Sequence, residues 1–468
     1  MAICLTFPVL LSAEVVIPRI LGHNMVLQRD QPVSIWGTAS VGERVQVKFS
    51  GQNKSAEADA KGKWSVVLDP MKASGVGQDL FITGSNTIVL KNILIGEVWL
   101  CSGQSNMEYT MRKNSKVTRP YKGLNPVDEL NYADNDSIRI FLVNRKELIK
   151  PDPANKGWSV ARDSALRSFS AAGYFFAKEL GKKLGVPVGM ISSAIPGSRI
   201  EPWIPASLLP EGDGDPGKFY TPMIEPLLPF AIKGFLWYQG ESNCFLNERT
   251  QYTDKMKLLI NSWRAAWGLT DMPFYYVQLA PFYYSRSEGK IKLHSESLPE
   301  FREAQEQALQ VANTGMIITT DLASDINDIH PPMKWEIGRR LALMALSDSY
   351  GVNEVGHSPV FTHMQIRGNK AEINFKFVGS GLYAKDGQDL RSFLIAGKDG
   401  RFVPARAVIS NNKVIVSSPA VKVPVSVRFA WNEADQPNFY NKEGLPAAPF
   451  RTDRPAGLIS NRLLYTIN

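Results

Sequence analysis

The chain has 468 residues, of which 44% are hydrophobic and 21% are charged. This composition excludes a disordered or fibrous protein and supplies apolar residues for two or three packed domains. The net charge of +8 is spread thinly, without a dense basic run, so we do not expect nucleic-acid binding.

The first thirteen residues, MAICLTFPVLLSA, form a short apolar run that ends in Ser12 and Ala13. Such a run is typical of the hydrophobic region and cleavage site of a secretory signal peptide. It lacks the usual N-terminal positive charge, and the alternative is an ordinary buried first strand. We expect a signal-peptide remnant over 1–13 and a periplasmic or secreted protein. Elsewhere no apolar stretch reaches the ~18 residues that a membrane span requires.

Residues 14–94 show a β pattern. Alternating runs such as VSIWG (33–37), RVQVKFS (44–50) and KWSVVL (63–68) are separated by Gly, Asn, Asp and Ser turns. This pattern predicts a small N-terminal β-sandwich domain.

At Ile95 the pattern changes, because IGEVWLCSG is apolar and stops abruptly in small polar residues, as a buried parallel strand does. Further strands then alternate with amphipathic helices. The strands are expected at 138–143, 188–193, 234–239, 273–279 and 315–320, and the helices at 172–184, 252–267, 300–312 and 333–349. The alternation predicts an α/β domain over 95–350, built on a doubly wound parallel sheet with about five buried strands.

After Gly351 the β pattern returns, with runs such as AEINFKF (371–377) and KVIVSS (413–418). We therefore expect a C-terminal β-rich domain over 351–468.

Three cysteines, Cys4, Cys101 and Cys244, are too few and too scattered for a disulfide framework or a zinc site. The sequence thus predicts neither a metal nor a cofactor. Cys101 and Cys244 follow two strands of the predicted sheet, and we expect buried free thiols there, with a bridge as the alternative.

Four loops are expected at the carboxyl edge of the sheet, where ligands of such sheets bind. They are 101–107, 194–198, 239–243 and 325–332, and they offer a hydroxyl, glycine N–H groups, side-chain amides and one histidine beside carboxylates. This set suits acyl transfer, because a serine hydroxyl needs a base within hydrogen-bond reach. Ser105 is the candidate nucleophile and His330 the candidate base. The N–H groups of Ser105 and Gly197 and the side-chain amide of Gln239 are the candidate oxyanion donors.

Competing motifs fail on context. A Gly-x-Ser-x-Gly elbow is absent from the sequence, and the stretch EGDGDPGK (211–218) follows no strand and has Phe219 where a phosphate-binding loop needs Ser or Thr. The sequence does not fix the separation of Glu108, Glu201 and Glu241, which a glycosidase pair would require.

Three motifs resemble the bacterial sialate O-acetylesterase family, a branch of the SGNH hydrolases that also includes acetylxylan esterases. They are GQSNM (103–107), WYQGESN (237–243) and NDIHP (327–331), and NMVLQR (24–29) and GLPAAPFR (444–451) extend the likeness over nearly the whole chain. The resemblance implies a serine esterase that removes O-acetyl groups from sugars without metal or cofactor. Gln239 departs from the asparagine of the wider superfamily, and Asn243 is the fallback donor.

In the superfamily the triad acid usually stands three residues before the histidine, a position that Asn327 occupies here. We expect Asp328 to act instead, with Asp325 second and a Ser–His dyad third. Arg199, Glu201 and Trp203 follow the second loop and are expected to contact the sugar, together with Glu241 and Asn243. The alternative for Arg199, Glu201 and Trp203 is a salt-bridged, packed loop.

Two functions follow from the sequence. The first is an O-acetylesterase that acts on acetylated sialic acids, or else on acetylxylan, with an acetylated carbohydrate as its partner. The second, suggested by Asn327 and the two β domains, is a carbohydrate-binding protein that has lost catalysis.

Overall fold

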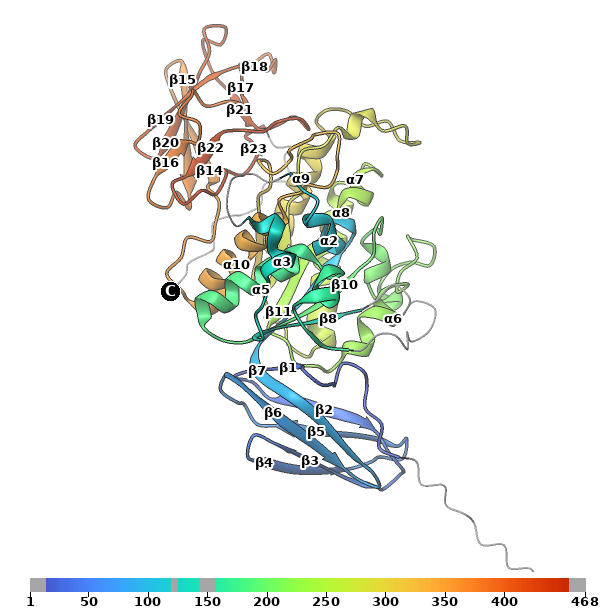
Figure 1. Cartoon of the computed structure of the whole chain (residues 1–468). Coiled ribbons are helices and arrows are strands. Elements are labelled where there is room, and N and C mark those ends of the chain that lie inside the picture. Colours follow the sequence, from blue (N-terminus) through green and yellow to red (C-terminus); the bar gives the residue numbers. More distant parts are fainter. Residues whose placement is uncertain (1–13, 119–124, 144–156, 454–468) are drawn as a thin grey trace, which may run out of the picture.

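The computed structural model describes residues 14–118, 125–143 and 157–453. Figure 1 shows a blue β unit at one end, a mixed α/β unit in the middle and an orange-red β unit at the other end. The expected signal-peptide segment, 1–13, lies outside the described residues.

The N-terminal unit is a β-sandwich, as the alternating pattern predicts. Strands β3 and β5 bury every second residue, so that Val47 and Val66 face the same interior. One sheet pairs β2 (Val33–Thr38) with β5 (Lys63–Leu68); the other joins β3 (Arg44–Phe49), β4 (Gln52–Glu57), β6 (Ser74–Thr83), β7 (Thr87–Gly103) and β1 (Val26–Gln28).

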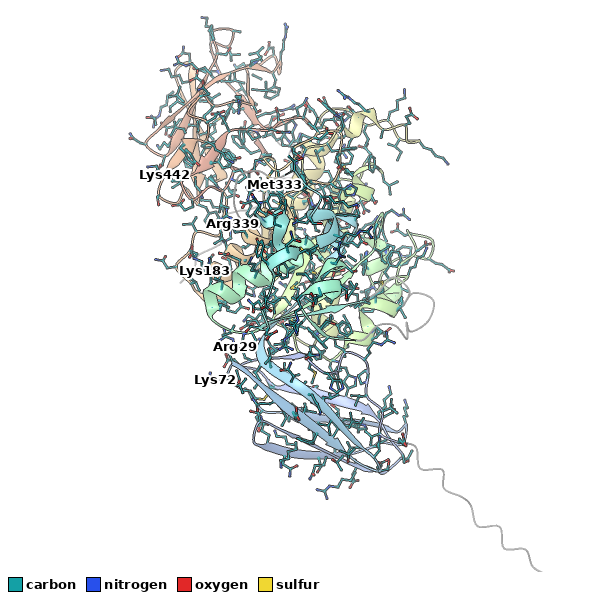
Figure 2. All side chains as sticks on the ribbon, viewed as in Figure 1. Arg29, Lys72, Lys183, Met333, Arg339 and Lys442 are labelled. Atoms are coloured by element: carbon teal, nitrogen blue, oxygen red, sulfur yellow. The ribbon has the colours of Figure 1, made fainter. Side chains whose placement is uncertain are left out.

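Strand β7 is 17 residues long and belongs to two parts of the molecule. Its first half pairs antiparallel with β6 in the sandwich, and its second half pairs parallel with two strands of the central sheet. Buried Glu97 lies at this junction and accepts hydrogen bonds from Gln28, Arg29 and Tyr350. Figure 2 shows Arg29 where the blue unit meets the central one.

The central sheet has the strand order β13-β12-β11-β7-β10-β8-β9. Its first six strands are mutually parallel and overlap the six ranges expected from the sequence, and the edge strand β9 is antiparallel. The strands other than β7 are β8 (Ile138–Leu142), β9 (Ser159–Val160), β10 (Val188–Ala194), β11 (Gly234–Tyr238), β12 (Phe274–Val277) and β13 (Thr314–Ile317). The chain order reverses on either side of β7, and α/β proteins bind ligands at such a point.

Helices cover both faces of the central sheet, as a doubly wound fold requires. Helices α5 (Ala171–Leu184) and α10 (Lys334–Tyr350) pack on one face, and α8 (Thr250–Ala266) and α9 (Ser297–Gln307) on the other. Ser170 caps the start of α5 through a hydrogen bond from Gly173 N, and Gly185 ends the helix in a left-handed conformation. The short helices are α1 (Ser105–Glu108), α2 (Met111–Asn114), α3 (Glu129–Tyr132), α4 (Asp163–Arg167), α6 (Tyr220–Met223) and α7 (Glu241–Cys244).

The C-terminal unit is built of antiparallel strands around a separate core that includes Phe393, Phe429 and Phe450. Arg428 and Arg451 pair with Glu296 and Glu303 near and on α9, at 2.9 and 2.6 Å, so the unit docks on the central one. Its sheets are β14 (Val360–Arg367), β15 (Lys370–Lys376), β20 (Lys413–Ser417) and β19 (Arg406–Ser410); β18 (Val403–Pro404), β17 (Phe393–Ala396), β21 (Ser426–Phe429) and β23 (Phe450–Arg451); and β16 (Leu382–Ala384) with β22 (Phe439–Asn441).

Candidate active site

The nucleophile loop begins where β7 ends. Gly103 has φ +137°, and a Cβ added there would lie 2.2 Å from the carbonyl oxygen of Tyr238, so only glycine lets β7 pass so close to β11. Ser105 opens α1 two residues later. As the first residue of a helix it has a backbone N–H without an intrahelical acceptor.

Ser105, His330 and Asp328 form a hydrogen-bonded chain. The Oγ atom of Ser105 lies 3.0 Å from His330 Nε2, and His330 Nδ1 lies 3.1 Å from Asp328 Oδ1. The same carboxylate oxygen accepts the backbone N–H of His330 at 2.9 Å. Asp328 therefore fixes both the ring and the backbone of the histidine, and its contact to Nδ1 leaves Nε2 for the serine proton.

The surroundings of His330 favour its unprotonated form. Burial lowers the pKa of the imidazole below its ordinary value; Asp328 acts against this shift, whereas the positive charges of Lys334 and Lys113 add to it. A neutral imidazole at neutral pH is the form that can accept a proton from serine.

The other two acid candidates have different contacts. Asp325 accepts the backbone and side-chain N–H groups of Asn327 at 2.9 and 3.0 Å, which closes the loop on itself. Asn327 Oδ1 in turn accepts Nη1 of Arg286 at 3.4 Å. Asp328 is thus the carboxylate in contact with the imidazole.

Gly197 offers an open approach to its backbone. It has φ +72°, and an added Cβ there would meet nothing within 4 Å. Its carbonyl accepts Ser242 Oγ at 3.1 Å, while its N–H has no acceptor within the described ranges. A free backbone donor in open space is what an oxyanion site requires.

Gln239 differs from the expectation, because its amide is already occupied. The side chain is fully buried, and Nε2 lies 2.8 Å from Asn243 Oδ1 and 3.2 Å from both Gln104 Oε1 and the Ser198 carbonyl. Two N–H groups thus face three protein acceptors. The fallback donor is occupied as well, since the Nδ2 of Asn243 contacts the carboxylates of Glu201 and Glu248.

The residues expected to contact the sugar are mostly internal. Trp203 is fully buried, donates Nε1 to Ser198 Oγ at 3.0 Å and meets Trp237 edge to face, so neither face of its ring is open for stacking. Glu201 is equally buried and pairs with Lys255 at 2.7 Å. The packed, salt-bridged alternative holds for both residues, while Arg199 is half-buried beside them.

Glu241 is also internal. It is buried and accepts a hydrogen bond from Asn106 Nδ2, and its Oε2 has no hydrogen-bond partner within the described part of the chain. Burial raises the pKa of this carboxyl. The polar atoms of Glu241 and Asn243 therefore face the protein interior, as those of Trp203 do. This orientation argues against the expectation that these residues bind sugar.

Three residues of the site were missed in the sequence. Asn106 and Gln104 flank the nucleophile; the Oε1 of Gln104 accepts Nε2 of Gln239, and Asn106 contacts the histidine loop. Arg286 is exposed, and its guanidinium lies 3.4 Å from the ring centroid of Tyr283. The position of the first two beside Ser105 was a usable signal, whereas nothing in the sequence around Arg286 marks it.

Cys101 and Cys244 are buried free thiols, as expected, and burial raises the pKa of Cys101 to about 12. Among the residues that the structure describes, no group of three or more His, Cys, Asp or Glu side chains is arranged to hold a metal ion. The same residues include no helix that is both long and apolar enough to cross a membrane.

Residues 95–347 match the model of a family described as carbohydrate esterase, sialic acid-specific acetylesterase. The chain is similar to sialate O-acetylesterases of Homo sapiens and Pongo abelii, at 28% and 27% identity over 94% of each chain. It is also similar to the crystal structure of a carbohydrate acetylesterase from Xanthomonas citri, with a TM-score of 0.85 and 36% identity over 94% of this chain and all of that one.

Proposed function

The chain belongs to the carbohydrate esterase family of sialic acid-specific acetylesterases, and from that membership we propose that it removes O-acetyl groups from sialic acids through an acetyl-Ser105 intermediate. The protein is a carboxylic ester hydrolase with an acetylated carbohydrate as substrate. One observation carries the mechanism, the 3.0 Å contact between Ser105 Oγ and His330 Nε2 with Asp328 behind the ring.

The proposed reaction has two halves. His330 takes the proton of Ser105 as Oγ attacks the acetyl carbonyl, and then returns that proton to the sugar oxygen as the ester C–O bond breaks. A water molecule, deprotonated by His330, attacks the acetyl-serine; the bond between the acetyl carbon and Oγ breaks, acetate leaves, and His330 returns the proton to Ser105 Oγ. The catalytic residues are therefore Ser105 as nucleophile, His330 as base and acid, and Asp328 as the group that holds the imidazole.

The negative oxygen of each tetrahedral intermediate needs donors fixed in advance. We propose the backbone N–H groups of Ser105 and Gly197, because Gly197 is open and its N–H has no acceptor in the described ranges. Gln239 serves as a third donor only by releasing one of its acceptors, Asn243, Gln104 or the Ser198 carbonyl.

The choice of sialic acid over xylan rests on charge. A sialic acid carries a carboxylate at neutral pH, whereas the xylan backbone is neutral. Arg286 lies beside the histidine loop through its contact to Asn327, and Arg199 follows the Gly197 loop; neither makes an ion pair within 4 Å in the described residues. A guanidinium is well suited to bind a carboxylate.

The test is hydrolysis of p-nitrophenyl acetate by the wild-type protein and by Ser105→Ala. We expect turnover by the wild type and a loss of about 1000-fold or more in the variant. A panel of O-acetylated sialic acids and acetylated xylo-oligosaccharides then identifies the sugar by acetate release. Absence of Ser105-dependent turnover on every substrate would point instead to a carbohydrate-binding protein without catalysis.

We also propose three domains, 14–94, 95–350 and 351–468. The second boundary is supported by the separate core of the C-terminal unit, and both are supported by the family match over 95–347. The sandwich is less independent, because β7 runs through the first boundary and one apolar cluster includes side chains from both sides.

Export to the periplasm or the medium is proposed from the apolar segment 1–13 alone. N-terminal sequencing of the protein from fractionated cells tests this point: an intact Met1 in the cytoplasmic fraction contradicts it.

A further inference from the structure

A buried lysine contacts the residue next to the nucleophile in the chain. Lys334, the first residue of α10 and next to the Met333 labelled in Figure 2, is fully buried, and its Nζ donates to Asn106 Oδ1 at 2.6 Å. The ammonium lies 4.9 Å from the ring centroids of both Tyr109 and Tyr238. No carboxylate within the described ranges lies within 4.0 Å of it. A buried ammonium without a directly paired carboxylate is costly, so its presence here needs an explanation.

Asn106 connects this lysine to three loops of the site. Its Nδ2 donates to Glu241 on α7 and to the carbonyl oxygen of Ile329 at 3.0 Å, while its Oδ1 accepts from Lys334. Both donors and the acceptor of the amide are therefore in use. Asn106 is the chain neighbour of Ser105, and Ile329 is the chain neighbour of His330, so one side chain fixes the distance between the nucleophile loop and the histidine loop.

The charge of Lys334 also reaches the base. Lys334 is one of the groups that lower the pKa of His330, after burial itself. Burial lowers the pKa of Lys334 to about 7, and the charges of Glu241 and Asp328 act in the opposite direction while that of Lys113 on α2 adds to the shift. These three charged groups, with His330 and the rings of Tyr109 and Tyr238, are the titratable groups that face the ammonium.

We propose that Lys334 is a positioning residue of the esterase reaction: through Asn106 it holds Ser105 and His330 in register, and it places a buried positive charge in the same network. This inference rests on the proposed function and adds to the triad a buried Lys334–Asn106–Glu241 network. In this proposal the network does not contact the substrate. It positions Ser105 and His330, which do.

The test is Lys334→Met, which keeps an unbranched side chain one atom shorter and removes the charge. We expect kcat for p-nitrophenyl acetate to fall about 100-fold, as a small misplacement of reacting groups does, with KM little changed. Removing a positive charge beside an imidazole favours its protonated form, so the acid limb of the kcat/KM profile should move to higher pH. A purely structural role would lower activity without moving that limb.

Lys113→Met is the matched control. Lys113 also lies over the ring of Tyr109, at 5.6 Å, but its side chain is 52% exposed and makes no contact to Asn106. We expect a change in kcat of less than about threefold. Any shift of the acid limb should disappear in about 1 M salt, because exposed charges are screened there.

Asn106→Ala separates the two parts of the proposal. It breaks the connection between the loops but leaves the lysine, so kcat should fall while the acid limb stays in place. Wild-type kcat in Asn106→Ala, or an acid limb that does not move in Lys334→Met, overturns the inference. If Lys334→Met does not fold, Asn106→Ala decides alone. A wild-type protein without Ser105-dependent turnover refutes the proposed function instead, which is a distinguishable result.

Discussion

The triad and a set of buried polar residues come from the four loops or from the residues directly after them, but they lie in different environments. His330 and Asp328 have side chains that are 34% and 60% exposed, and Ser105 is half-buried. In contrast, Gln239, Asn243 and Glu201 are buried completely, and the side chain of Asn243 is hydrogen-bonded to both of the others. Polar residues of one motif therefore have two roles: some react with the substrate, and others hold the loops in place. Residues only one or two positions apart in the sequence can differ in this role.

Among the variants that test this comparison, the substitution of Asp328, the acid of the triad, should have the largest effect. Asp328→Asn should lower kcat about 100-fold or more, because the carboxylate fixes the imidazole and stabilises its charged form. The loss should stay below the roughly 10⁴-fold of a fully buried acid, since Asp328 is more than half exposed.

Asp325→Asn is the matched control, because Asp325 bonds to Asn327 and not to the imidazole. Its kcat should remain within about threefold of wild type. Equal, small losses in the two variants would remove Asp328 from the triad and leave a Ser–His dyad.

The buried polar residues should respond in stability. Lys255→Met removes the cation that lies 2.7 Å from Glu201 and 3.1 Å from Glu248, and leaves two carboxylates beside Asn243. Breaking a buried pair in this way typically costs about 3 kcal/mol, which should appear as a lower Tm in thermal unfolding. The KM for p-nitrophenyl acetate should not change.

Lys257→Met, on the same helix, is the control for that experiment. Lys257 donates to the side-chain oxygen of Gln310 at 3.0 Å and makes no ion pair among the described residues, so the Tm of this variant should stay near that of the wild type. A raised KM with an unchanged Tm in Lys255→Met would mean that Glu201 and its neighbours bind substrate after all.

How much of this was predictable can be followed residue by residue. The strand ends could be predicted from the sequence, because an apolar run that stops in Ser, Gly or Gln marks the edge of a parallel sheet. This pattern placed Ser105, Gly197 and His330 in adjacent loops. The burial of Trp203 and Glu201 could not be predicted in this way, because residue type alone does not tell which side of a loop packs on α8. The contact of Lys334 to Asn106 joins residues 228 positions apart and depends on how α10 packs.

Substrate charge offers a smaller effect. Arg286→Met should lower kcat/KM for an O-acetylated sialic acid about tenfold, the size of one charge-assisted hydrogen bond at an exposed site. For the methyl ester of the same sugar, which lacks the carboxylate charge, the variant and the wild type should agree.

Arg199→Met, measured on the same two substrates, compares the two sides of the site. If Arg199 rather than Arg286 carries the preference, the carboxylate binds on the side of the Gly197 loop. If neither substitution lowers kcat/KM for the acid relative to its methyl ester, the protein does not recognise the charge of the substrate.

The smallest predicted effect concerns the pH at which kcat/KM begins to fall. The base must be unprotonated, so kcat/KM should fall as pH drops through the pKa of His330, which lies below the ordinary value of about 6.5. A pH–rate profile of the wild type on p-nitrophenyl acetate checks this, and an acid limb above 6.5 would contradict the sign of the shift.

Strand β7 has a consequence for how the protein folds. The first half of this 17-residue strand belongs to the sandwich, and its second half ends two residues before the nucleophile, with Glu97 held at the junction by Gln28 and Tyr350. A hinge between the two units would have to break a continuous hydrogen-bonded ladder, so the sandwich cannot swing as a separate lobe. We expect the two units to melt in a single cooperative transition, and a truncation at residue 95 to unfold the catalytic sheet rather than release it.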